Sequence, residues 1–181
     1  MQNVNNAGTG MSPDMCEVPH RCPVAHMCMP GREVPCHHVG RSHDLKLDLC
    51  RQLEDIADSL PHVDRRKCLI VASMLVPLLR ESHRFEEDCV FPAFVDDVAH
   101  REQRLKTVER LKQEHIEDEC SAQDLTETLL SIGRGAPISN PEALGFMLRA
   151  FFESMRRHIA FEREHIFPIL LGERGNAPRH N

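Results

Sequence analysis

The chain of 181 residues contains no tyrosine and no tryptophan, and aromatic residues make up only 4% of it. Their absence excludes a mechanism that stores a stable radical on either side chain. The longest apolar run, residues 68–79, has only twelve residues and is interrupted by Ser73 and Pro77. Because a helix needs about 20 apolar residues to cross a bilayer, we expect no membrane partner.

Positive charge is also scarce, since the 22 Lys and Arg are outnumbered by 28 Asp and Glu and the net charge is −6. This balance argues against a nucleic-acid partner. Residues 1–15 show no basic segment followed by an apolar run, so we expect a cytoplasmic protein. In that compartment the eight cysteines would remain thiols, or serve metal or redox chemistry, rather than form a disulfide framework.

The composition changes near residue 40. Residues 1–40 hold five of the twelve prolines, four of the nine glycines and four of the eight cysteines, but none of the eight phenylalanines. We interpret this segment as a largely irregular tail with little core of its own. The predicted organisation is an N-terminal tail over residues 1–40, a helical domain over residues 41–172 and a C-terminal tail over residues 173–181.

The N-terminal tail is dense in cysteine and histidine. Cys16, Cys22, Cys28 and Cys36 are interspersed with four histidines, at spacings that contain no CxxC pair. A second metal site, for zinc or a transiently held iron, is one interpretation of this density. A reactive thiol cluster and a tail without defined structure are the other two.

From Ser42 onward, apolar residues recur every three or four positions, and no stretch alternates as a strand would. Four helices are predicted, over residues 42–60, 65–94, 103–132 and 141–171. Ser42, Asp64 and Asn140 are the expected N-caps, and Pro77 lies inside the second helix. The sequence therefore predicts an all-α fold, an up-down-up-down four-helix bundle.

Two of the predicted helices carry a histidine four residues before a glutamate. These pairs are His83 with Glu87 and His158 with Glu162. Four residues of an α-helix return to nearly the same face, so each pair points in one direction. Each pair could therefore bind one ligand with both side chains.

The other two predicted helices contribute single histidines, His43 and His115. In an antiparallel hairpin, residues at equal depth have their midpoint in the connecting turn. The midpoint of His43 and His83 falls in the first predicted turn, that of Glu87 and His115 in the second, and that of His115 and His158 in the third. We therefore expect these side chains to share one layer of the bundle.

A layer of buried ionisable groups is costly without an ion to satisfy it, although any single pair could arise by chance among twelve histidines. The predicted metal ligands are His43, His83, Glu87, His115, His158 and Glu162, with Glu119 as a candidate seventh. Six or seven nitrogen and oxygen donors suit two first-row ions bridged by carboxylates. The same donors would accept iron, manganese or zinc.

The order His, HxxxE, His, HxxxE, with Phe-Pro after each HxxxE, resembles the hemerythrin-like (HHE cation-binding) family over roughly residues 41–172. The resemblance implies a non-haem di-iron centre bridged by Glu87, Glu162 and an oxo or hydroxo group. Glu119 stands where the oxygen-carrying members have a histidine, and Glu162 follows its histidine by four residues rather than five. Both departures favour the bacterial-type branch, which is linked to O2 or NO sensing, iron handling and repair of iron–sulfur centres.

A centre rich in neutral imidazole favours holding ferrous iron and binding a diatomic gas over oxygen activation. We expect a protein that binds, buffers or senses O2 or NO at an open coordination position. Phe85, Leu111 and Phe161 would line that position or serve only in core packing. The alternative is a di-iron enzyme or iron-handling factor that turns over peroxide or NO or repairs iron–sulfur centres. Signalling or iron transfer would require a separate protein partner.

Overall fold

The computed structural model describes residues 36–96 and 98–172. Four long helices form an antiparallel bundle: α1 (Cys36–Asp58), α2 (Arg65–Phe85), α4 (Arg101–Gly133) and α5 (Pro141–Phe161). The described residues include no strand, so the all-α prediction is confirmed. Most of the predicted N-terminal tail, with Cys16, Cys22 and Cys28, and residues 173–181 lie outside the described residues.

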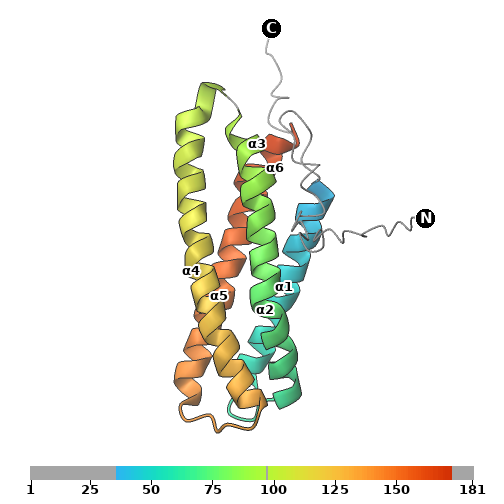
Figure 1. The fold of residues 1–181 in the computed structure, drawn as a ribbon, viewed down its shortest axis with the longest axis vertical. Helices are drawn as coiled ribbons and strands as arrows, with labels where there is room; N and C mark the ends of the chain where they lie inside the picture. Colours follow the sequence, from blue (N-terminus) through green and yellow to red (C-terminus); the bar gives the residue numbers. More distant parts are fainter. Residues whose placement is uncertain (1–35, 97, 173–181) are drawn as a thin grey trace, which may run out of the picture.

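The helices pack in the order that an up-down-up-down chain dictates (Figure 1). The most extensive contacts join α2 to α4 and α1 to α5, whereas α4 and α5 touch less. None of the described helices combines the length and the apolar character needed to cross a membrane.

Short π-helical turns continue two of the long helices. η2 (Glu86–Val90) connects α2 to α3 (Phe91–Val95), and η4 (Glu162–Ile166) connects α5 to α6 (Phe167–Leu170). Each turn begins at a glutamate and ends just before a Phe-Pro pair. Because proline has no N–H and its ring crowds the carbonyl four residues earlier, the wider π turn is favoured at both places. A 3-10 turn, η3 (Val98–His100), leads into α4.

Two of the three predicted N-caps are confirmed. The side chain of Asp64 accepts hydrogen bonds from the backbone of Arg66 and Lys67, and that of Asn140 accepts one from Ala143. The prediction for Ser42 is wrong, because α1 begins six residues earlier, at Cys36. Ser42 lies inside the helix and donates its hydroxyl to Ser82 of α2 at 2.7 Å.

The core is divided into two apolar clusters. The larger one is built from leucines and other apolar residues of all four long helices, including Leu53, Leu75, Leu129 and Leu148. The smaller one gathers Phe85, Phe91, Phe94, Leu111 and Ile166 at the end that holds α3 and α6. On α1 and α4 the buried polar residues fall between the members of the two clusters, and along α2 and α5 they fall where the larger cluster gives way to the smaller one.

The cysteines of the bundle differ in environment. Cys50 and Cys68 are buried free thiols, and burial raises the pKa of the Cys50 thiol to about 11, which makes it unreactive at neutral pH. Cys120 is free and exposed. Cys89 is disulfide-bonded, contrary to the expectation that the cysteines remain thiols.

Candidate metal centre

Seven buried polar side chains form one layer between the two apolar clusters. This polar layer consists of His43, Lys46, His83, Glu86, His115, His158 and Glu162, each no more than 4% exposed. All four long helices contribute, because the layer crosses the bundle at one depth. The structure thus brings together the four predicted histidines and Glu162.

Three of the histidines, one each from α2, α4 and α5, are held from outside by carboxylates. The pairs are His83 Nδ1 with Glu119 Oε1 at 3.0 Å, His115 Nδ1 with Glu87 Oε1 at 2.9 Å and His158 Nδ1 with Glu114 Oε2 at 3.1 Å. A carboxylate only accepts, so each Nδ1 carries a proton, and a ring that carries only this proton turns its Nε2 lone pair inward. Histidines that bind metals are oriented in the same way by outer carboxylates.

Five inward atoms of the layer are buried without a hydrogen-bond partner among the described residues. They are His83 Nε2, His115 Nε2, His158 Nε2, Glu86 Oε2 and Glu162 Oε1. Buried polar atoms are normally paired, since an unpaired one loses its hydration without return. Three imidazole nitrogens and two carboxylate oxygens are also the donors that first-row metal ions take. The residues present therefore fit a metal site.

His43 is oriented differently. Arg163 Nε donates to His43 Nδ1 at 3.3 Å, and the same guanidinium donates to Asp44 Oδ1 at 3.0 Å. Because a guanidinium can only donate, Nδ1 is unprotonated and Nε2 carries the proton. That proton is donated to Glu162 Oε2 at 2.8 Å. His43 thus turns an N–H, not a lone pair, into the polar layer.

Lys46 is a functional candidate that the sequence analysis missed. Its ammonium has no exposed surface and lies 2.8 Å from Glu86 Oε1, which also accepts from Ser82 Oγ at 2.8 Å. Burial would lower the pKa of Lys46, but the charges of Glu86 and then Glu162 outweigh it and raise the pKa above its usual value. A sequence signal existed, because Lys46 falls on the buried stripe of α1 three residues after His43.

The structure also places a different glutamate of the first pair in the polar layer. Glu86 is 1% exposed, whereas the predicted ligand Glu87 is 35% exposed and contacts the outer nitrogen of His115. The buried stripe of α2 runs through Leu79, Ser82 and Glu86, which puts Glu86 at its centre. Sequence analysis selected Glu87 because it repeats the four-residue spacing of the second pair.

Glu119, the candidate seventh ligand, lies at the edge of the layer rather than within it. Its carboxylate is 29% exposed, pairs with His83 Nδ1 and accepts from Arg80 Nε at 3.4 Å. It can therefore orient the ring of His83.

Electrostatics keep the inward donors in the forms that bind cations. Burial, and then the neighbouring His115, lower the pKa of His83 to about 2, so its ring is neutral. Burial and the Glu86 charge would raise the pKa of Glu162, but contacts with His158 and His43 hold it at about 2. Burial would also raise the pKa of Glu86, yet the charge of Lys46 keeps it well below its usual range. Both carboxylates are thus ionised.

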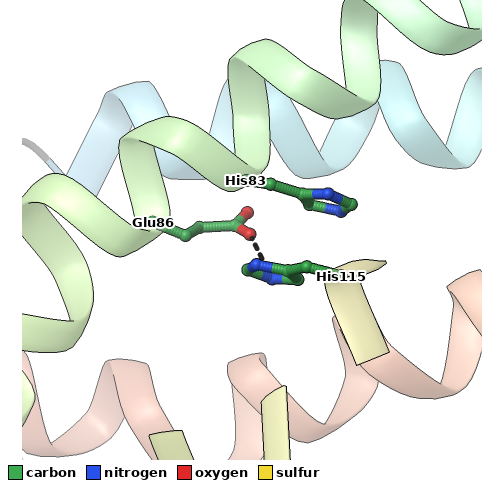
Figure 2. A group of neighbouring side chains, drawn as sticks. All are labelled: His83, Glu86 and His115. Carbon is green, nitrogen blue, oxygen red and sulfur yellow. Dashed lines mark ion pairs between the residues drawn. The ribbon is translucent and has the colours of Figure 1, made fainter. Parts of the chain in front are cut away.

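Two groups of three ligand atoms lie within 4.8 Å of one another, and Glu86 belongs to both. The first group is His83, Glu86 and His115, and the second is His43, Glu86 and Glu162. Figure 2 shows the first group, with the stacked rings of His83 and His115 beside the Glu86 carboxylate. His158 stands next to both, because its Nε2 is 3.8 Å from Glu162 Oε1 and its ring centroid is 5.1 Å from that of His115.

A groove of about 430 Å³ between α4 and α5 reaches the edge of the polar layer. It is lined by Glu114, which holds His158 from outside, and by Asp118, one turn after His115. Burial raises the pKa of the Asp118 carboxyl. The groove follows the less tightly packed pair of helices, and Glu114 and Asp118 make this part of its lining acidic.

Comparison with known proteins gives one positive result. No match was found among curated proteins or among solved structures. Residues 34–170 match the family model described as the hemerythrin HHE cation binding domain, and this span holds every residue of the polar layer. A span of that length is well over half of the chain. The chain therefore belongs to the hemerythrin HHE cation-binding family.

Proposed function

We propose that the protein holds non-haem iron in the polar layer and binds a diatomic gas, O2 or NO, there. The observation that carries the proposal is the set of five buried inward atoms that lack partners within the described bundle. Membership of a cation-binding family supports the same conclusion. The donors, imidazole nitrogens and carboxylate oxygens, suit iron among the first-row metals.

The chain's own residues would contribute to the metal site in two ways. The outer carboxylates fix the histidine rings, so that the Nε2 lone pairs stay inward. Glu86 and Glu162 supply negative charge from opposite helices. Ferrous iron, when bound, supplies the electrons that hold O2 or NO.

The surroundings favour binding of a small apolar gas. The ring of Phe91 stacks on His115 at 5.4 Å between centroids, and that of Phe167 stacks on His43 at 5.0 Å. Of the predicted lining residues, Phe85 and Leu111 are buried in the smaller apolar cluster and Phe161 packs against it. This cluster limits access of water to one side of the layer, whereas O2 and NO dissolve readily in apolar surroundings.

Metal analysis of anaerobically purified protein, followed by visible spectra with O2 and separately with NO, tests the proposal. We expect bound iron and new absorption bands that fade when the gas is removed. Iron that only oxidises, or that consumes peroxide or NO in the presence of a reductant, would replace gas binding by the enzymatic alternative. Protein that binds no iron under these conditions would overturn the proposal.

A further inference from the structure

The two groups of ligand atoms that share Glu86 differ in what already satisfies them. In the second group, His43 Nε2 donates to Glu162 Oε2 at 2.8 Å. Lys46 Nζ donates to the remaining member, Glu86 Oε1, at 2.8 Å. Proton donors of α1 thus occupy one oxygen of each buried carboxylate.

The tautomer of His43 reinforces this difference. Arg163 Nε donates to its Nδ1 and is itself held by Asp44. A metal ion on His43 Nε2 would have to remove the ring proton and break the bond to Glu162. It would also have to approach the ammonium of Lys46, whose charge is not screened by solvent because none of it is exposed.

The first group has the opposite character. His83 Nε2, His115 Nε2 and Glu86 Oε2 are buried and have no hydrogen-bond partner in the described part of the chain. His115 Nε2 and Glu86 Oε2 lie 3.2 Å apart (Figure 2). A proton on Nε2 would make this contact an ion pair, whereas in a ring that carries only the Nδ1 proton donated to Glu87 both atoms present lone pairs, which one bound metal ion would satisfy together. Two ligands on neighbouring positions of one ion at about 2.1 Å lie roughly 3 Å apart, which fits this distance.

We propose that the polar layer holds one divalent metal ion, bound by His83 Nε2, His115 Nε2 and Glu86 Oε2. The ammonium of Lys46 takes the place that a second ion would need. This inference rests on the proposed metal-binding function, and it differs from the two ions that the ligand count of the sequence predicts.

The three ligands match a known class of centre. Two histidines and one carboxylate on one face of an ion are typical of ferrous iron with open positions. The other two inward atoms without a hydrogen-bond partner among the described residues are His158 Nε2 of α5 and Glu162 Oε1 of η4, and they face the same layer. They are placed to complete the coordination or to contact a bound gas.

The test counts ions in the metal-free full chain by anaerobic titration with Co(II), followed by visible absorption. Because Glu86 belongs to both groups, the number of layer ions is the number lost on Glu86→Gln. Ions held elsewhere, such as on the tail cysteines, remain in both proteins and cancel. We expect a difference of one equivalent.

Variants of Lys46 then test the part assigned to its charge. Lys46→Met removes the ammonium with little change of volume. When Glu86→Gln is added to this variant, the number of Co(II) equivalents lost should be two instead of one. Lys46→Arg keeps the charge and should stay at one. Lys106→Met, at an exposed lysine paired with Glu102, is the matched control and should also stay at one.

Each outcome bears on a different claim. Two layer ions in the unsubstituted chain overturn the inference, even if Lys46→Met fails to fold, and leave the proposed function intact. One ion in both the unsubstituted chain and Lys46→Met overturns the role of Lys46. One ion that shows no response to O2 or NO overturns gas binding and supports the inference. No Co(II) bound in the layer overturns both.

Discussion

Glu86 and Glu87 are neighbours in the chain but hold different places in the site. Glu86 turns into the polar layer an oxygen that has no hydrogen-bond partner among the described residues, whereas Glu87 holds His115 from outside. We predict that Glu86→Gln loses the layer metal, because a neutral amide replaces the charged donor. Glu87→Gln should weaken metal binding by about 10- to 100-fold, as loss of an outer carboxylate does. Metal titration of both variants checks this.

The control for that comparison is Glu102→Gln, since the Glu102 side chain is 86% exposed and pairs with Lys106 on the surface. It should bind metal as the unsubstituted chain does. If Glu87→Gln lost the metal and Glu86→Gln kept it, the sequence-based choice of Glu87 would be right and the structural assignment wrong.

His158 gives the site a dependence on pH. Burial would lower its pKa, but the Glu162 carboxylate outweighs burial and raises the pKa above 6.5. At a given pH a larger share of the rings therefore keeps the second proton, and a dication bound beside the ring must displace it. We predict that affinity rises with pH until His158 is neutral, by up to about tenfold per unit for one linked proton.

Calorimetry in buffers of different ionisation enthalpy measures the proton released on Co(II) binding at pH 7. The release should be largely absent in His158→Gln. Equal proton release by both proteins would assign the proton to another group.

At the scale of elements, the π turns η2 and η4 position the two buried carboxylates. Each turn starts at the glutamate that enters the polar layer, Glu86 or Glu162, and each precedes a Phe-Pro pair. The wider turn changes the direction of the following residues without ending the helix. It therefore lets each helix deliver both a carboxylate to the layer and a phenylalanine ring, Phe91 or Phe167, against a histidine.

The close approach of α2 and α4 near their shared end gives a prediction about stability. A Cβ on Gly133 would lie 2.5 Å from Leu69 Cγ and 3.0 Å from the carbonyl oxygen of Arg65. We predict that Gly133→Ala lowers the free energy of unfolding by about 1–3 kcal/mol through this overlap. Chemical denaturation of the metal-free protein measures it.

Gly40→Ala, inside α1, is the matched control because no heavy atom lies within 4 Å of its added Cβ. It should raise the free energy of unfolding by roughly 0.5–1 kcal/mol, since alanine is the better helix former. A gain in stability from Gly133→Ala would show that α2 and α4 are not so closely packed.

At the scale of the whole molecule, the polar layer exists only when α1, α2, α4 and α5 are assembled. The unfolded chain has no such site, so metal binding must stabilise the fold. At a free metal concentration one hundred times the Kd, the gain should be about 2.7 kcal/mol, seen as a rise in Tm. Thermal unfolding with and without Co(II) measures it.

The Glu86→Gln variant distinguishes metal bound in the polar layer from metal bound elsewhere. Because it lacks the layer metal, it should show no rise in Tm at the same Co(II) concentration. An equal rise in both proteins would place the stabilising ion outside the layer, for example on the cysteines of the predicted N-terminal tail. That tail site stays a prediction.

The helical repeat and the turns were readable from the sequence because both depend on local spacing. Apolar residues at every third or fourth position, together with Asp64 and Asn140, marked the helices. The midpoint rule then set the depth of the four histidines, since an antiparallel hairpin relates depth to distance from its turn. For these reasons the sequence alone determined the bundle, the layer of histidines and the family.

Only the tertiary structure decided which neighbouring side chains enter that layer. Glu86 and Glu87 lie about 60° and 40° to either side of His83 on an α-helix, so helical spacing alone admits both. Packing against α1 and α4 selects Glu86, because Lys46 and His115 meet it there. The burial of Lys46 and the inverted tautomer of His43 likewise depend on partners from distant helices, Glu86 and Arg163, which no local pattern reveals.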